Sequence, residues 1–123
     1  MILVDTSVWI DHLRATDQTL TDLLGRDEVV CHPLIIQELA LGSIKDRDLV
    51  LGSLARLRQC RTLNHEEVLK LVSSWSLWGE GLSAVDVHLL GSAILSAGTQ
   101  IWTRDKGLRA SASSVGLVSV AWN

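Results

Sequence analysis

Short, mostly apolar runs mark three places along the chain. They span Ile2–Val4, Val29–Cys31 and Gln100–Trp102. None of them alternates apolar with polar residues, as a strand with one solvent-facing side would. We therefore expect three strands, and we expect the first two to be buried, as in the centre of a parallel sheet.

Helical patterns lie between these runs. Pro33 and Gly42 delimit a helix over Pro33–Leu41, because proline suits the first turn and glycine the position after the last one. Apolar residues follow Asp86 at 3, 4, 7, 8 and 11 positions, which predicts a helix over 83–97. The other expected elements are helices at 8–14, 20–25, 46–59, 65–78 and 105–111, an edge strand at 61–63 and a last strand at 117–120. Strands that alternate with helices predict an α/β fold, a three-layer sandwich around a central, mainly parallel sheet.

Composition narrows the class of protein. The chain has 123 residues, so we expect one domain over 1–123. Eleven basic and fourteen acidic side chains leave a net charge of −3, which excludes a nucleic-acid binder that relies on bulk positive charge. A binder that uses a local basic rim or a metal ion stays possible. The start of the chain lacks a basic segment, and no apolar run nears about 18 residues, so we expect neither a signal peptide nor a membrane span.

Cysteine and tryptophan content adds two expectations. Cys31 and Cys60 form no CxxC pair, so we expect reduced thiols, packed as small buried hydrophobes in a cytoplasmic protein. The chain has no Tyr or Phe, so large aromatic burial falls on its five Trp residues. Trp75 and Trp78 lie three positions apart on the expected helix 65–78, where core packing and a partner-binding groove are both open.

Two acids stand out against their surroundings. Asp5 directly follows the first buried strand, at the sheet edge where ligands bind in open parallel sheets. The alternative is that Asp5 caps the helix that follows. Glu38 shares a helical face with Leu34, Ile35 and Leu41, so we expect it in an apolar stripe, where an unpaired charge is costly. A salt bridge to an arginine would be the structural explanation.

Two further acids open helices. Asp86 lies in line with the apolar stripe of helix 83–97, and Ser83 to Asp86 also resembles a capping box. Asp105 follows the strand that ends at Trp102, and helix-dipole stabilisation with Thr103 as the cap would explain it. Carboxylates gathered in one place repel each other, so such a cluster normally holds a cation. Oxygen-only ligands favour Mg²⁺ or Mn²⁺, and acids at Mg²⁺ sites most often serve phosphoryl chemistry.

The ordered set of these acids carries a family resemblance over nearly the whole chain. Asp5-Thr6-Ser7 after the first strand, the helix from Pro33 to Glu38-Leu39, Leu82 to Asp86 at a helix start, and Thr103-Arg104-Asp105 after a strand resemble the PIN domain. The small size is similar to VapC-type toxins of toxin–antitoxin pairs. No single one of these motifs is specific to the family. The specific signal is the ordered set of one Asp, one Glu and two further Asp residues.

The resemblance implies a role for each matching position. Asp5, Glu38, Asp86 and Asp105 would form the catalytic quartet that holds Mg²⁺ or Mn²⁺, with Thr6 and Thr103 in support. The implied activity is metal-dependent endoribonuclease cleavage of RNA that inhibits translation. The implied partners are the RNA substrate, a VapB-like antitoxin whose C-terminal tail covers the site, and a second copy in a homodimer. No membrane is involved.

Other side chains receive lesser roles. Arg14, Arg104 and Lys106 could contact RNA phosphates or the antitoxin at the rim of the site, or be solvated charges. The four histidines share no metal-ligand spacing, so we expect surface or hydrogen-bonding roles for them. Two other functions stay open: a PIN-like RNA- or protein-binding module without catalysis, and another metal-dependent phosphohydrolase with Asp5 as nucleophile.

Overall fold

The computed structural model describes residues 1–120 and 122, and its centre is a four-stranded parallel sheet. The strand order is β3-β2-β1-β4, so the N-terminal strand lies inside the sheet. Leu3 pairs with Val30 on one side and with Ile101 on the other. The strands are β1 (Ile2–Val4), β2 (Val29–Cys31), β3 (Arg58–Gln59) and β4 (Gln100–Trp102).

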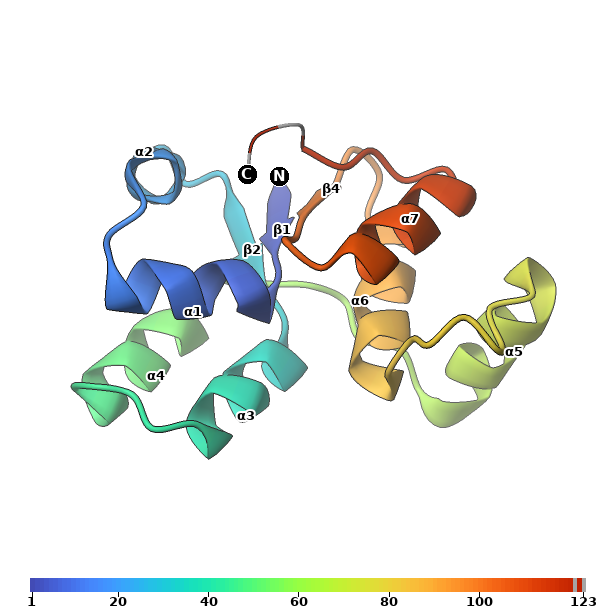
Figure 1. Cartoon of the computed structure of the whole chain (residues 1–123), viewed down its shortest axis with the longest axis horizontal. Helices are drawn as coiled ribbons and strands as arrows, with labels where there is room; N and C mark the ends of the chain where they lie inside the picture. Colours follow the sequence, from blue (N-terminus) through green and yellow to red (C-terminus); the bar gives the residue numbers. More distant parts are fainter. Residues whose placement is uncertain (121, 123) are drawn as a thin grey trace.

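Helices connect the strands and cover both faces of the sheet, which confirms the predicted three-layer α/β sandwich. Figure 1 shows α1 to α4 on one side of the sheet and α5 to α7 on the other. On the first side α3 contacts α1 and α4, and on the second side α5 contacts α6. The helices are α1 (Thr6–Arg14), α2 (Gln18–Gly25), α3 (Pro33–Leu41), α4 (Arg47–Ala55), α5 (His65–Trp75), α6 (Ala84–Ile94) and α7 (Lys106–Ser114).

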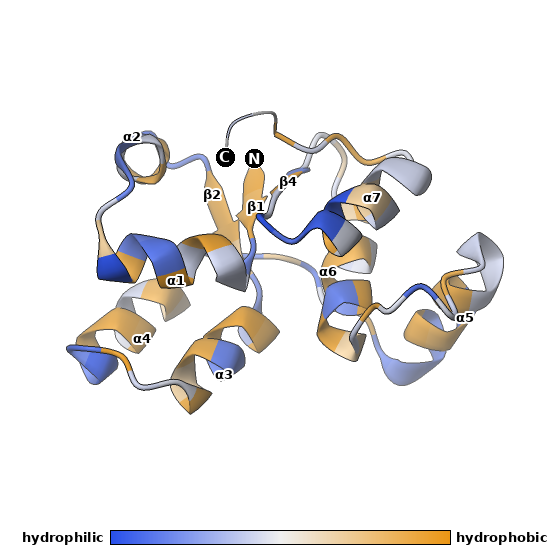
Figure 2. Cartoon of the chain, in the orientation of Figure 1, coloured by the Kyte–Doolittle hydropathy of each residue, from blue (hydrophilic) through white to orange (hydrophobic). Residues whose placement is uncertain are grey.

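The core forms around the apolar strands. All three residues of β1 and of β2 are buried, and both strands are coloured as hydrophobic in Figure 2. Trp9 and Trp102 complete this core. The expectation that all five Trp residues supply buried aromatic area is wrong, since Trp75, Trp78 and Trp122 are exposed.

Several expected boundaries are corrected. The expected edge strand at 61–63 lies instead at Arg58–Gln59, because α4 already ends at Ala55 and the chain reaches the sheet earlier. The expected last strand at 117–120 is reduced to one parallel bridge between Ile101 and Ser119. Helix α5 ends at Trp75, where Ser76 takes a left-handed conformation, so Trp78 does not share a helical face with Trp75.

Two further expectations concern burial and membranes. Cys31 is buried as expected, while Cys60 is only partly buried at the edge of the sheet. Among residues 1–120 and 122, no helix is long and apolar enough to cross a membrane.

Candidate functional site

The predicted site lies where β1 and β4 end side by side. Val4 and Trp102 are the last paired residues of these two strands. Just beyond them, the backbone N–H of Asp5 donates to the carbonyl of Trp102 at 2.8 Å. Asp5 and Thr103 therefore leave the sheet at the same point. Figure 2 shows the segment that follows β4 as strongly hydrophilic, in contrast to the strands.

Asp5 is held by two hydroxyl groups. Its carboxylate is buried, with 8% of the residue exposed. Ser7 Oγ donates to Asp5 Oδ2 at 2.8 Å, and Thr103 Oγ1 donates to the same oxygen at 2.7 Å. Asp5 stands at the N-cap position of α1 but makes no side-chain capping bond. The alternative interpretation of Asp5 as a helix cap is therefore wrong.

Backbone donors fix the direction of both hydroxyl protons. The N–H of Arg104 donates to Ser7 Oγ at 3.1 Å, and the N–H of Asp105 donates to Thr103 Oγ1 at 3.0 Å. Each hydroxyl thus accepts one bond from the 103–105 segment and gives its proton to Asp5. Ser7 was not predicted as a residue of the site. Its position two residues after an acid at a helix start was the available signal, since hydroxyls there often bond locally.

Asp105 begins α7 as its N-cap. Asp105 Oδ1 accepts from the N–H of Gly107 at 2.9 Å, and Asp105 is otherwise exposed. Thr103 does not cap this helix, because its hydroxyl accepts from the N–H of the N-cap residue Asp105 and not from an N–H inside α7. The expectation of helix-dipole stabilisation at Asp105 fits, with Asp105 itself as the cap.

Asp86 combines a structural and an electrostatic role. It forms the predicted capping box with Ser83: Asp86 N–H donates to Ser83 Oγ and Ser83 N–H donates to Asp86 Oδ2, both at 3.1 Å. Burial raises the pKa of the Asp86 carboxyl, bonds with Ser83 oppose that change, and the charges of Asp5 and Asp105 raise it further. The fold therefore brings Asp86 close enough to Asp5 and to Asp105 for its charge to interact with theirs.

Glu38 does not lie in the buried apolar stripe that the sequence pattern predicted. It is exposed, and Leu41, expected on the same buried face, is 89% exposed. Helix α3 instead buries Ile35 and Leu39, which are four positions apart, and Glu38 is one residue off that stripe. No arginine pairs with Glu38 among the described residues; Thr6 Oγ1 donates to Glu38 Oε1 at 2.7 Å. Thr6 follows Asp5, so this bond links α3 to the start of α1 beside the other acids.

The basic residues differ in their surroundings. Arg104 forms ion pairs with Asp11 and Asp17, so its guanidinium binds the protein itself. Lys106 is exposed at the first turn of α7. Arg14 lines a hollow of about 330 Å³ beside Ile10 of α1, with the loop between α3 and α4 on its other side.

The buried His32 and the half-buried His88 form a ring contact that the sequence did not predict. The rings of His32 and His88 meet edge to face, with centroids 6.1 Å apart. His32 Nδ1 accepts from the N–H of Leu34 at 3.0 Å and caps α3. Burial, and to a smaller extent the charge of His88, lowers the pKa of His32 to about 4. The expectation of a hydrogen-bonding role is confirmed for His32, which is neutral near pH 7.

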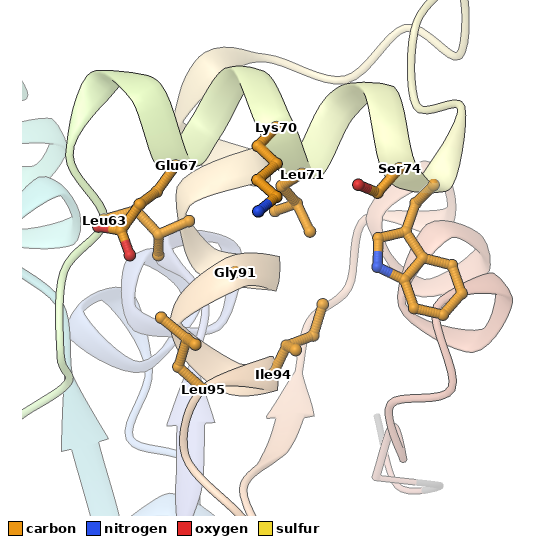
Figure 3. A pocket seen from close by; sticks show the side chains of 9 residues that line it. Leu63, Glu67, Lys70, Leu71, Ser74, Gly91, Ile94 and Leu95 are labelled. Carbon is orange, nitrogen blue, oxygen red and sulfur yellow. The ribbon is translucent and has the colours of Figure 1, made fainter.

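A second hollow, of about 300 Å³, lies between α5 and α6 and is shown in Figure 3. Leu71 of α5 and Ile94 of α6 point into it, and Trp75 of α5 also lines it. Its lining includes none of the four predicted acids. The candidate site is therefore an open edge of the sheet and not this hollow.

The four acids do not form a compact metal-binding cluster. Across residues 1–120 and 122, no three His, Cys, Asp or Glu side chains converge tightly enough to hold a metal ion by themselves. Mg²⁺ usually keeps several waters and binds through only one or two carboxylates, so a wider spacing suits it. All the donor atoms are oxygens, which Mg²⁺ and Mn²⁺ prefer. The negative charges of Asp5 and Asp105 act on Asp86, and a bound cation would relieve this repulsion. The chemistry of these donor atoms is therefore of the kind that suits Mg²⁺ or Mn²⁺.

Comparisons with known proteins give consistent results. A family model described as the PIN domain matches residues 2–113. The chain is 60% identical over 117 residues to a protein named Ribonuclease VapC32 from two strains of Mycobacterium tuberculosis, CDC 1551 and H37Rv, covering 95% of this chain and 94% of that protein. The crystal structure of PAE2754 from Pyrobaculum aerophilum aligns with a TM-score of 0.61 at 19% identity, covering 89% of this chain and 83% of the other. At that identity, the last likeness concerns the fold alone.

Proposed function

We propose a catalytic function from one premise: this chain belongs to the PIN-domain family and, within it, to the VapC ribonucleases. It would be an endoribonuclease toxin that cleaves RNA phosphodiester bonds and depends on Mg²⁺ or Mn²⁺. The observation that carries the proposal is geometric: Asp5 and the 103–105 segment leave β1 and β4 side by side, and the charges of Asp5 and Asp105 both act on Asp86 at the start of α6. The carboxyl ends of these two strands form the edge of a parallel sheet where ligands bind.

Each of the four acids would contribute differently to binding the cation. Asp5 is the most constrained of them, because both of its hydroxyl partners bond to Oδ2. Among the described residues nothing donates to Asp5 Oδ1, so that oxygen would serve as a cation ligand. Asp86 and Asp105 would add charge from the starts of α6 and α7, and Glu38 from α3. When bound, the cation supplies activation of water and neutralises charge on the phosphate and leaving oxygen.

The chain's own contribution is orientation. Asp5 stays fixed because its two hydroxyl donors are themselves fixed by the backbone of the 103–105 segment. The carboxylates of Asp86 and Asp105 are fixed because each accepts a backbone N–H at its helix start, from Ser83 and from Gly107. Thr6 holds Glu38 toward the same region. Carboxylates that are oriented in advance lose little freedom when a substrate phosphate arrives, which favours in-line attack.

The remaining roles follow from the family. We propose RNA as the substrate and inhibition of translation as the consequence of cleavage. We also propose a VapB-like antitoxin, a homodimer and a cytoplasmic location. Lys106 and Arg14 would contact RNA phosphates or the antitoxin from the rim of the site. We do not assign Arg104 to this contact, because its guanidinium forms ion pairs with Asp11 and Asp17.

The test compares wild type with Asp5→Asn on total cellular RNA, with Mg²⁺, with Mn²⁺ and with EDTA. The asparagine carbonyl can still accept from Ser7 and Thr103, so the variant should fold. Asp48→Asn is the matched control for the loss of one carboxylate, because Asp48 is an exposed residue of α4. We expect discrete fragments that need metal, persist with the control and vanish with Asp5→Asn.

Two results would overturn the proposal. One is folded, antitoxin-free wild type that binds RNA but cleaves none in either metal, which would favour a binding module. The other is a set of fragments that persists in EDTA and with Asp5→Asn. A covalent phosphoryl group on Asp5 would instead favour the alternative phosphohydrolase.

A further inference from the structure

Arg104 ties together three parts of the fold around the candidate site. Its Nη1 donates to Asp11 Oδ2 of α1 at 2.7 Å, and its Nη2 donates to Asp17 Oδ2 at 2.8 Å. Asp17 is the N-cap of α2, because its Oδ1 accepts from the N–H of Leu20. The guanidinium also lies 5.7 Å from the ring centre of Trp102, the last residue of β4.

The backbone of the same residue contacts the site. Arg104 N–H donates to Ser7 Oγ, and Ser7 Oγ donates to Asp5 Oδ2. The preceding residue, Thr103, donates to that same oxygen. One residue therefore bonds the first two helices through its side chain and the buried carboxylate through its backbone and a hydroxyl.

We propose that Arg104 is a positioning residue for the cation site, which rests on the function proposed above. Its two ion pairs hold the 103–105 segment against α1 and α2, and this segment sets the direction of the Ser7 and Thr103 protons toward Asp5. Without the ion pairs the segment is held less firmly, so the Ser7 and Thr103 hydroxyls orient the Asp5 carboxylate less well and the cation binds less tightly. Partners that orient a metal ligand commonly contribute 10- to 100-fold, as an order of magnitude, to metal affinity.

This role differs from contact with an RNA phosphate. The Arg104 side chain is only 25% exposed and already meets two carboxylates, each at a distance typical of a charge-assisted hydrogen bond. A phosphate would have to displace at least one of them. A phosphate contact acts only when RNA is present, whereas a positioning role acts on the cation alone.

The test measures Mn²⁺ binding to the free protein by electron paramagnetic resonance, without RNA. Arg104→Gln removes the charge, and Asp17→Asn weakens the ion pair from the other side while it keeps a good capping side chain for α2. Arg58→Gln is the matched control, because it breaks a surface ion pair with Asp27 away from the site. Circular dichroism and the melting temperature confirm that each variant is folded.

We expect Mn²⁺ to bind about 10-fold more weakly to Arg104→Gln and measurably more weakly to Asp17→Asn. Arg58→Gln should match wild type. Arg104→Lys should restore only part of the affinity, because an ammonium group lacks the fork that reaches two carboxylates in fixed directions.

Three outcomes have distinct meanings. Wild-type Mn²⁺ affinity in folded Arg104→Gln overturns the inference, whether or not the variant binds RNA more weakly. An equal loss in Arg58→Gln also overturns it, since the effect would then be a general one of charge or stability. If wild type binds Mn²⁺ no more tightly than Asp5→Asn does and cleaves no RNA, the proposed function itself is wrong. The inference about Arg104 then falls with it.

Discussion

The hydroxyl of Thr103 donates a 2.7 Å hydrogen bond to Oδ2 of Asp5, although 98 positions separate the two residues. The pairing of β1 with β4 brings them together, because Val4 and Trp102 are neighbours in the sheet. A buried bond to an ionised group contributes more to stability than an ordinary one. This hydrogen bond therefore both stabilises the edge of the sheet and orients the Asp5 carboxylate in the site.

Thr103→Val keeps the shape of the side chain and removes the hydroxyl. It leaves the Asp5 carboxylate with one donor fewer and the Asp105 N–H without its acceptor. We expect the free energy of unfolding to fall by about 2 kcal/mol in urea denaturation. RNA cleavage should fall by about 10-fold or more. Thr103→Ser restores the hydroxyl, so a serine variant as impaired as valine would contradict this explanation.

Two capping boxes on neighbouring helices allow a matched comparison. Ser83 caps α6, which carries Asp86, while Asn64 caps α5, which carries none of the four acids. Ser83→Ala and Asn64→Ala should each lower the free energy of unfolding by about 1 kcal/mol. Only Ser83→Ala should reduce RNA cleavage, because it releases the backbone around Asp86. Equal activity in two equally destabilised variants would show that this cap is structural alone.

The pH dependence of stability should reflect His32. His32 must be neutral to accept from the Leu34 N–H, and its pKa falls from 6.5 to about 4 on folding. Between these two values the unfolded chain binds a proton that the folded protein does not, so stability falls as pH falls. The loss approaches about 3 kcal/mol near pH 4.

His32→Asn is the variant that isolates this effect. Asparagine is a good N-cap residue that does not titrate in this range, so α3 keeps its cap. Urea denaturation at pH 7 and at pH 4.5 should show a smaller decrease in stability for the variant than for wild type. Parallel decreases would mean that other groups dominate. His12, whose pKa burial also lowers, contributes to both proteins and cancels in the difference.

Lys106 tests the predicted rim contact with RNA. It is exposed at the first turn of α7, next to Asp105. If it contacts a phosphate, Lys106→Gln should raise KM, leave kcat unchanged and reduce the slope of log affinity against log salt by about one. Lys70→Gln, on α5, is the control. An unchanged salt slope for Lys106→Gln would exclude the contact.

The sequence by itself determined those features that depend on neighbours along the chain. Unbroken apolar runs predicted β1 and β2 with their observed bounds, because strands buried on both faces need no polar alternation. The short run from Gln100 to Trp102 predicted β4. Pro33 and Gly42 predicted both ends of α3, and the spacing of Ser83 and Asp86 predicted a capping box. These signals are local, so three or four adjacent residues suffice to make them.

The tertiary structure decided which side chains meet. The burial of Ile35 and Leu39, and with it the exposure of Glu38, depends on which face of α3 packs inward, and an apolar run around much of a helix does not specify that face. The bonds from Ser7, Thr103 and Arg104 depend on β1 lying beside β4, a pairing that brings together residues about a hundred positions apart. Hydrogen bonds need atoms within about 3 Å, and only the folded sheet fixes distances of that size between distant segments. The sequence therefore supplied the acids, and the pairing of two strands decided how Asp5 is held.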